Sequence, residues 1–191
     1  AKTNPKRVVF AEADHLDVLK AAQIVMEEGI GNPILLGNKE IILELKKEIG
    51  FDEEVPILDP KTPECDAKRM QYANTFWESR KRRGISLLDA EKWMRERNYF
   101  AAMMVNEGEA DALVTGFSRS YPSVVKPILE LIDKAPGVDK VATTNMMMTN
   151  RGPMCLSDTA INSNPSAQDL AKIALMTAKT VRMFGMEPVI A

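Results

Sequence analysis

The sequence predicts an α/β fold, with a three-layer parallel-sheet domain followed by the start of a second α/β domain. Over the first sixty residues, short and continuously apolar runs alternate with amphipathic helical patterns. Such runs between helices are typical of a parallel sheet that is buried on both faces. The pattern changes near Ala135-Pro136-Gly137, which predicts a domain boundary between residues 1–135 and 136–191.

The first half of the sheet is predicted from apolar runs and from residues that begin or end helices. The three apolar runs are Arg7–Ala11, Pro33–Gly37 and Val55–Leu58. Asp14 and Asn38 can cap the two helices that follow the first two runs. Gly29 and Gly50 are placed to end those helices, since glycine readily adopts the left-handed conformation found there.

A helical pattern extends from about Pro63 to Gly108. The basic run Arg80–Arg83 has the charge that favours a helix C-terminus. Ser86 and Asp89 have the spacing of a capping box for the next helix. The apolar pattern then continues over Glu91–Asn106, which predicts an unbroken helix before the fourth strand.

The last third of the chain has a different pattern. Two strand-like runs, Lys140–Thr149 and Pro153–Ile161, flank a hairpin loop at Thr149–Gly152. A helix is predicted over Ala167–Phe184, and Val189–Ala191 resembles the start of another strand. Because a buried strand does not normally finish within three residues, we expect the chain to be a fragment with a missing continuation.

The loop that follows the apolar stretch Ala112–Val114 is the leading candidate site. It lies at the carboxyl end of a parallel strand, the edge where open α/β sheets bind ligands. A helix N-terminus there offers free backbone N–H groups to an anion. Arg119 suits a bidentate phosphate contact, and Lys126 adds a charge one helical turn later. The predicted ligand-binding residues are Thr115, Gly116, Ser118, Arg119, Ser120, Tyr121 and Lys126.

The alternative is an ordinary strand-to-helix turn, in which a hydroxyl caps the helix and Arg119 is solvated. Gly116 stands alone, so neither a dinucleotide fingerprint nor a Walker loop is present. A second polar cluster, Ser157–Thr159 with nearby asparagines, favours turn chemistry. His15 is expected to be an exposed first-turn residue, and Met146–Met148 to pack within a strand. No catalytic residue and no metal site can be assigned.

Composition excludes several classes of function. The net charge of −2 and the pI of about 5.6 argue against a nucleic-acid partner. Two cysteines are too few for a disulfide framework, which favours the cytoplasm. The sequence contains no run of eighteen apolar residues, so no membrane-spanning segment is expected.

Long phrases of the sequence resemble the phosphate acetyl/butyryltransferase family. They are PKRVVFAEADHLDVLKAAQIVMEEGIGNPILLGN, FAAMMVNEGEADALVTGFSRSYPSVVKPILELI and DTAINSNPSAQDLAKIALMTAKTVRMFGMEPVIA. YANTFWESRKRRGISLLDAEKWMRERNYFAAMMV is similar to the transferase-like C-terminal region of large bacterial NADP-dependent malic enzymes. The resemblance implies two α/β domains with a coenzyme A cleft between them. It places the family's principal catalytic Ser, Arg and Asp beyond Ala191.

The loop departs from the family's pattern at three positions. Thr115-Gly116 keeps the turn and Ser120 keeps a serine, but the usual His, Thr and Arg are replaced by Arg119, Tyr121 and Lys126. Lysine cannot make the bidentate contact of arginine. The resemblance therefore implies a regulatory domain that senses acetyl-CoA; the alternatives are an active phosphate acetyltransferase and a structural oligomerisation domain.

The same resemblance implies which ligands and partners to expect. Acetyl-CoA or phosphate is the expected ligand, and this fragment is expected to bind no cofactor of its own. NADP and a divalent metal are expected in upstream malic enzyme domains. A homo-oligomer without nucleic acid or membrane is the expected assembly.

Overall fold

The computed structural model describes residues 2–191. The chain divides into two compact units, Ala1–Asp133 and Lys134–Ala191, which we call unit 1 and unit 2. This division falls just before the boundary that the sequence predicts. Each unit is described by itself.

Unit 1 contains a four-stranded sheet in which every pair of neighbouring strands is parallel, so the predicted fold class is confirmed. The strands are β1 (Lys6–Phe10), β2 (Gly31–Leu36), β3 (Ile57–Leu58) and β4 (Ala112–Val114). They lie in the order β3-β2-β1-β4. Phe10 of β1 lies opposite Val114 of β4, so the residues after these two strands meet at one edge of the sheet.

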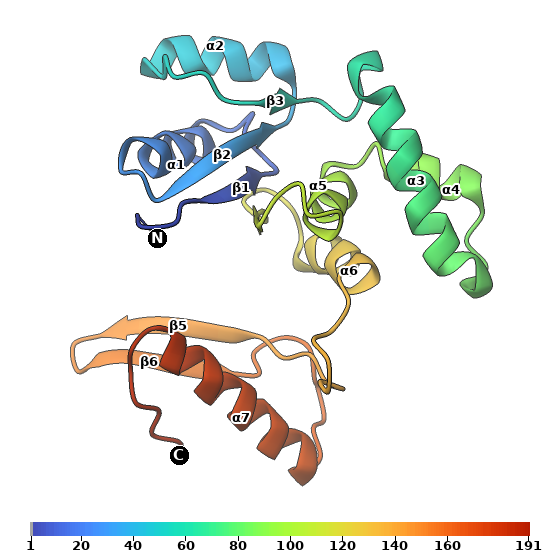
Figure 1. The fold of residues 1–191 in the computed structure, drawn as a ribbon. Helices are drawn as coiled ribbons and strands as arrows, with labels where there is room; N and C mark the ends of the chain where they lie inside the picture. The colour runs from blue at the N-terminus through green and yellow to red at the C-terminus, as the bar shows by residue number, and fades with distance from the viewer. Residues whose placement is uncertain (1) are drawn as a thin grey trace. The chain divides into compact units, whose positions relative to one another are not determined.

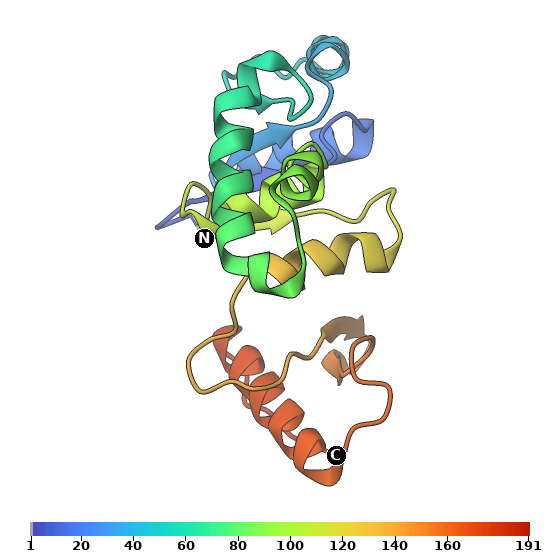
Figure 2. The same ribbon diagram turned by 90° about the vertical axis from the view of Figure 1, so that its right-hand side faces the viewer.

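The described part of unit 1 also contains six α-helices (Figures 1 and 2). They are α1 (Leu16–Glu27), α2 (Lys39–Ile49), α3 (Asp66–Arg80), α4 (Leu87–Trp93), α5 (Arg97–Asn106) and α6 (Tyr121–Leu131), with 3₁₀ turns at Pro63–Cys65 and Lys81–Arg83. Phe10 packs in a core with α1 and α2, whereas Val9 packs in a second core with α3, α4, α5 and α6. Successive strand residues point to opposite faces, so burial on both sides explains the continuous apolar runs.

Several predicted helix ends are confirmed. The Asn38 side chain accepts a hydrogen bond from the N–H of Ile41 at 3.1 Å and caps α2. Gly50 ends that helix with φ of 67°, a left-handed conformation that glycine adopts without a Cβ penalty. Ser86 and Asp89 form both halves of the capping box that begins α4.

Two helix predictions are wrong. The predicted continuous helix Glu91–Asn106 is broken by a turn at Met94–Glu96, which separates α4 from α5. Asp14 does not cap α1; His15 occupies the cap position and makes no side-chain cap bond. The Asp14 carboxylate instead binds the guanidinium of Arg97, the first residue of α5 after this turn.

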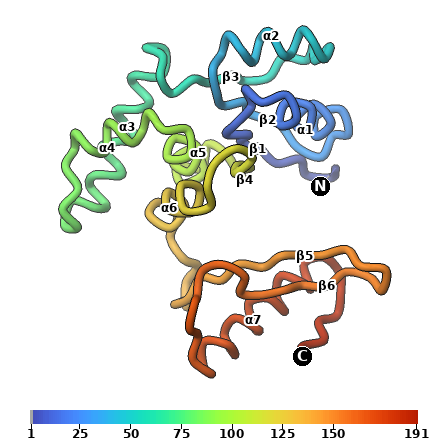
Figure 3. The backbone as a smooth tube through the Cα atoms, turned by 180° about the vertical axis from the view of Figure 1, so that it is seen from behind, coloured from blue at the N-terminus to red at the C-terminus, as the bar shows by residue number. Residues whose placement is uncertain are grey.

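Unit 2 contains an antiparallel hairpin and a helix that runs along it (Figure 3). The hairpin strands are β5 (Thr144–Thr149) and β6 (Gly152–Ser157), and the helix is α7 (Ala167–Met183). Hairpin and helix are both predicted by the sequence and confirmed. The predicted strand at Val189–Ala191 is wrong, since those residues have no regular structure and pair with no strand in the described chain.

The methionines of β5 do not pack as predicted. Met146, Met147 and Met148 are 38%, 45% and 79% exposed within the chain. A two-stranded hairpin has only one face against α7, so it cannot bury three consecutive side chains.

In the described residues, no helix is long and apolar enough to cross a bilayer.

Candidate functional site

The loop after β4 closes around a carboxylate from the end of β1. Glu12 Oε1 accepts hydrogen bonds from the N–H groups of Gly116 at 2.8 Å and Phe117 at 2.9 Å. Glu12 Oε2 accepts from the N–H of Ser118 at 2.9 Å and from the Ser118 hydroxyl. Glu12 is only 1% exposed. The backbone N–H groups of Gly116, Phe117 and Ser118 are therefore bonded within the chain and are not free for an external anion.

These donors keep Glu12 ionised despite its burial. Burial by itself raises the pKa of the Glu12 carboxyl, because it disfavours the charged form. The Ser118 hydroxyl and the three N–H groups stabilise the carboxylate and outweigh burial, so the pKa of Glu12 lies below its usual value. The loop therefore holds a permanent negative charge at neutral pH.

A second carboxylate at the same edge of the sheet is also paired. Arg97 donates to the two oxygens of Asp14 at 2.6 and 2.9 Å, and the side chains of Arg97 and Asp14 are 18% and 12% exposed. The hydrogen bond to Asp14 raises the pKa of Arg97. Burial opposes ionisation of Asp14, but its bonds to Arg97 lower the pKa overall. This pair ties the turn after β1 to α5.

Thr115 and Gly116 shape the loop. The Thr115 hydroxyl donates to Oδ1 of Asn98 at 2.7 Å, and Asn98 is 8% exposed. Gly116 has φ of 98°, where a side chain is strained even though a Cβ would meet only Val124 at 3.8 Å. Thr115 and Gly116 thus support the loop, and their polar atoms contact other residues of the chain.

Arg119 and Lys126 line one pocket of about 240 Å³. The other residues that line it are Trp93, Glu96, Arg97, Asn98, Tyr99, Ser123 and Pro127. Arg119 is exposed and makes no hydrogen bond or ion pair with any residue in the range 2–191. Lys126 Nζ lies 5.4 Å from the ring centroid of Trp93 and 3.9 Å from Glu130 Oε1. The structure thus brings these two predicted cations together.

The remaining predicted site residues lie at the start of α6. Ser120 occupies the N-cap position, but its side chain makes no cap bond and its hydroxyl donates to Ser123 Oγ at 3.2 Å. Tyr121 is the first residue of α6 and is 46% exposed. Of the seven predicted residues, three surround Glu12, two begin the helix, and two line the cationic pocket.

Glu12 belongs to this site but is not among the residues predicted from the sequence. β1 and β4 are parallel, with Phe10 opposite Val114. Glu12 and Gly116 each lie two residues beyond this pair, so the sheet brings them to the same edge. An acid directly after a buried strand was the available signal, but its partner becomes evident only when the strand order is known.

His15 is half-buried rather than exposed. Its ring centroid lies 5.4 Å from that of Phe117, in a tilted arrangement. The contact places the chain's single histidine against an apolar ring.

The polar cluster after β6 has a structural role, as the sequence favours. The Asp158 carboxylate accepts bonds from the N–H and hydroxyl of Thr143 at 3.0 and 2.6 Å, and from the N–H of Asn162 at 2.7 Å. Burial opposes ionisation, but these donors outweigh it and lower the pKa of Asp158. Asp158 thus holds together the turn before α7.

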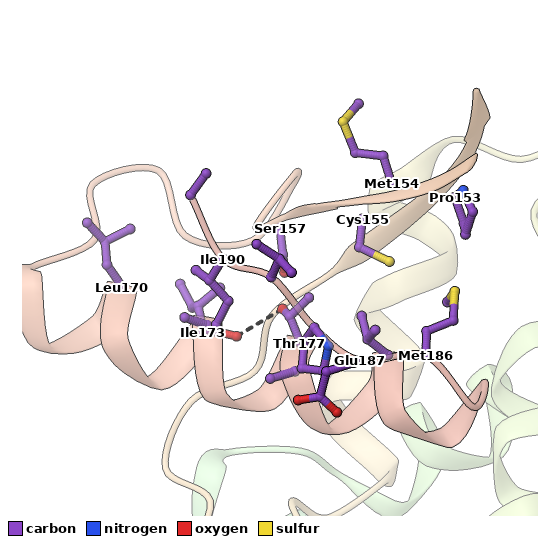
Figure 4. Close-up of a pocket in the computed structure, with 16 residues that line it drawn as sticks. Pro153, Met154, Cys155, Ser157, Leu170, Ile173, Thr177, Met186, Glu187 and Ile190 are labelled. Carbon is purple, nitrogen blue, oxygen red and sulfur yellow. Dashed lines mark hydrogen bonds between the residues drawn. The ribbon is translucent and has the colours of Figure 1, made fainter. Parts of the chain in front are cut away.

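Unit 2 contains a larger pocket of about 600 Å³ between β6, α7 and the residues after α7 (Figure 4). Cys155 and Ile173 lie on its walls, and the Thr177 hydroxyl donates to the Ile173 carbonyl at 2.9 Å. Glu187 is the charged residue that lines it. The pocket contains no set of converging polar groups that would fix a ligand.

Across residues 2–191, no group of three His, Cys, Asp or Glu side chains is placed to hold a metal ion.

The comparisons with known proteins agree with this fold. The family model for Phosphate acetyl/butaryl transferase matches residues 1–191. The chain therefore belongs to that family. The EutD phosphotransacetylase from Staphylococcus aureus has the same fold, with a TM-score of 0.83 and 31% identity over 98% of this chain and 56% of its own.

Curated relatives include both enzymes that the resemblance suggests. A phosphate acetyltransferase from Thermoanaerobacterium thermosaccharolyticum is 35% identical over all of this chain and 59% of its own length. An NADP-dependent malic enzyme from Haemophilus influenzae is 34% identical over all of this chain and 26% of its own length. The chain thus spans only part of the length of the relatives it matches.

Proposed function

We propose that this chain is a phosphotransacetylase-like regulatory domain of a hybrid NADP-dependent malic enzyme, and that it senses acetyl-CoA. In the proposal, Arg119 and Lys126 bind a phosphate group of the effector. The parent enzyme oxidatively decarboxylates malate to pyruvate, with NADP and a divalent metal bound in other domains. The malic enzyme relative supports this, because its match covers the whole of this chain. A cytoplasmic homo-oligomer completes the proposal.

The pocket shared by Arg119 and Lys126 is the observation that carries the proposal. Arginine binds phosphate through a planar fork of N–H donors, and lysine adds a point charge. Pockets for whole small-molecule ligands usually have volumes of roughly 300–1,000 Å³. A pocket of about 240 Å³ suits a phosphate group better than a whole acyl-CoA. The rest of the effector would lie outside this pocket.

The local chemistry favours binding over group transfer. A general base must exchange a proton near neutral pH, and a guanidinium remains protonated there. Arg119 therefore cannot serve as a base where the family's phosphotransacetylases have histidine. The chain's single His15 packs against Phe117. Ser118 already donates its hydroxyl to Glu12.

The second candidate is an active phosphate acetyltransferase, which moves an acetyl group between coenzyme A and phosphate. The phosphate acetyltransferase relatives favour it, since the match with the Thermoanaerobacterium protein also covers all of this chain. An acetyl-phosphate assay separates the two candidates. Formation of acetyl phosphate from acetyl-CoA and phosphate by the purified protein, above a no-protein control, supports the transferase.

Calorimetric titration with acetyl-CoA tests the site in the natural protein that carries this sequence. Arg119→Ala should weaken binding about tenfold to hundredfold, the range expected for losing a hydrogen bond to a charged group. Lys126→Ala should weaken it less, because Lys126 already lies near Trp93 and Glu130. Arg82→Ala is the matched control, since it removes one exposed positive charge from the Lys81–Arg83 turn.

The same variants test regulation in the malic enzyme. Malate-dependent NADP reduction should require more acetyl-CoA for a half-maximal response in Arg119→Ala, while kcat and KM without effector stay near wild type. An unchanged midpoint means that this pocket is not the effector site. Absence of any acetyl-CoA binding favours the structural oligomerisation domain instead.

A further inference from the structure

The hydrogen bonds around Glu12 have the geometry of an anion-binding nest. Three successive N–H groups, from Gly116 to Ser118, converge on one carboxylate at 2.8–2.9 Å. Concave groups of backbone N–H donors bind phosphates and other anions in many proteins. In this chain the occupant is the side chain of Glu12, a residue that is only 1% exposed.

We propose that Glu12 is the resident anion of this nest, that it positions Arg119, and that it keeps external phosphate out of the loop. Glu12 is a positioning residue, since it acts through the loop backbone. The part that concerns Arg119 rests on the proposed function. The resident anion itself rests only on the geometry of Glu12 and the loop.

The effect on Arg119 follows from its place in the chain. Arg119 directly follows Ser118, whose N–H and hydroxyl both bind Glu12. The guanidinium of Arg119 has no bond of its own within residues 2–191, so no contact of its head fixes its direction. The position of its backbone, and hence the reach of its side chain into the pocket beside Lys126, depends on the bonds to Glu12.

The exclusion of phosphate follows from charge and burial. To enter the nest, a phosphate would have to displace an ionised carboxylate from all its donors. Moving Glu12 aside without leaving the interior would strand a buried charge. Leaving Glu12 in place would bring two anions together. An external phosphate is therefore left with the side-chain cations Arg119 and Lys126.

Chemical rescue tests the resident anion directly. Glu12→Ala removes the Cγ methylene and the carboxylate, a fragment that acetate matches in shape and charge. Hydrogen exchange of the Gly116–Ser118 amides should speed up about tenfold to hundredfold in this variant. Acetate should restore the protection, and neutral acetamide of similar shape should not.

Leu19→Ala is the control for general instability. Leu19 is fully buried in the core between the sheet and α1, and it has no bond to the loop. It should lower the thermal midpoint while the Gly116–Ser118 amides stay protected at temperatures where unit 1 is folded. Acetate should not change its behaviour. If Glu12→Ala does not fold, Glu12→Gln is the second variant. Because its side-chain amide is neutral, Glu12→Gln should protect the Gly116–Ser118 amides less than wild type and more than Glu12→Ala. Acetate should not increase this protection.

The phosphate arm separates this inference from the proposed function. Inorganic phosphate should bind wild type through Arg119 without changing the exchange of the Gly116–Ser118 amides. In Glu12→Ala without acetate, phosphate should enter the vacated nest and protect those amides, and acetate should compete with it there. If wild type binds no phosphate but acetate still protects the loop of Glu12→Ala, the proposed function fails and the resident anion stands. If Glu12→Ala and Glu12→Gln leave the loop amides protected, or acetate and acetamide act alike, the inference is wrong.

Discussion

The Asp14–Arg97 ion pair offers a quantitative test of how unit 1 is held together. The pair links the turn after β1 to the first residue of α5 through two bonds of 2.6 and 2.9 Å. Both side chains are less than one-fifth exposed. Asp14→Ala would leave the guanidinium of Arg97 largely buried without its partner. Removing one member of a buried pair costs about 3–5 kcal/mol when burial is complete.

Partial exposure reduces the expected cost for this pair. We expect Asp14→Ala to lower the free energy of unfolding of unit 1 by about 2–3 kcal/mol, close to the value of one or two hydrogen bonds to charged groups. Arg97→Ala should have a similar effect. The double variant should be less destabilised than the sum of the two, by a coupling energy of about 1–3 kcal/mol, because no charge is then left unpaired.

The two tryptophans make this measurement specific to unit 1. Trp77 lies in α3 and Trp93 in α4, and the chain has no other tryptophan. Urea unfolding followed by tryptophan fluorescence therefore reports on unit 1 even where unit 2 unfolds separately. A coupling energy below about 0.5 kcal/mol would refute the reasoning, since exposed pairs of no structural consequence fall in that range.

Two further predictions concern pH and helix capping. Arg7 lowers the pKa of Asp111 to about 2, so the interaction stabilises unit 1 above the unfolded value of roughly 3.9 and is lost as pH falls towards 2. Asp111→Asn should flatten the fluorescence-monitored loss of stability between about pH 4 and pH 2, and an unchanged curve counts against it. Ser166→Ala removes one half of the capping box with Asp169 and should destabilise α7 by about 1 kcal/mol, seen as faster amide exchange in its first turn. Equal exchange rates in wild type and variant would contradict the second prediction.

Local signals in the sequence were enough to predict most elements of the fold. A cap such as Asn38 and a helix end such as Gly50 act within a few residues, so their effect can be seen without the tertiary structure. The break between α4 and α5 is different. Helical spacing continues through Met94–Glu96, and α5 begins after the turn at Arg97, whose partner Asp14 lies 83 positions away. Periodicity cannot reveal such a contact.

The candidate site could likewise be predicted from local sequence only in part. The transition from β4 to α6 indicated where polar groups would gather, and Arg119 and Lys126 do line one pocket there. The state of the backbone donors was not predictable, because Glu12 lies 104 residues before Gly116. A helix N-terminus or loop identified from sequence is therefore only a potential anion site. Its donors must first be shown to lack a partner within the chain.

The presence of Glu12 in the nest changes what kind of anion recognition this loop can provide. Backbone donors in a fixed loop are organised before a ligand arrives, whereas arginine and lysine side chains lose conformational freedom on binding. A phosphate held by Arg119 and Lys126 alone should therefore bind with modest affinity that falls with ionic strength. Modest affinity suits an effector site, which has to respond over a range of concentration rather than remain saturated. Under the proposed function, the buried carboxylate removes the backbone donors from the loop, and phosphate binding would then depend on the exposed cations Arg119 and Lys126.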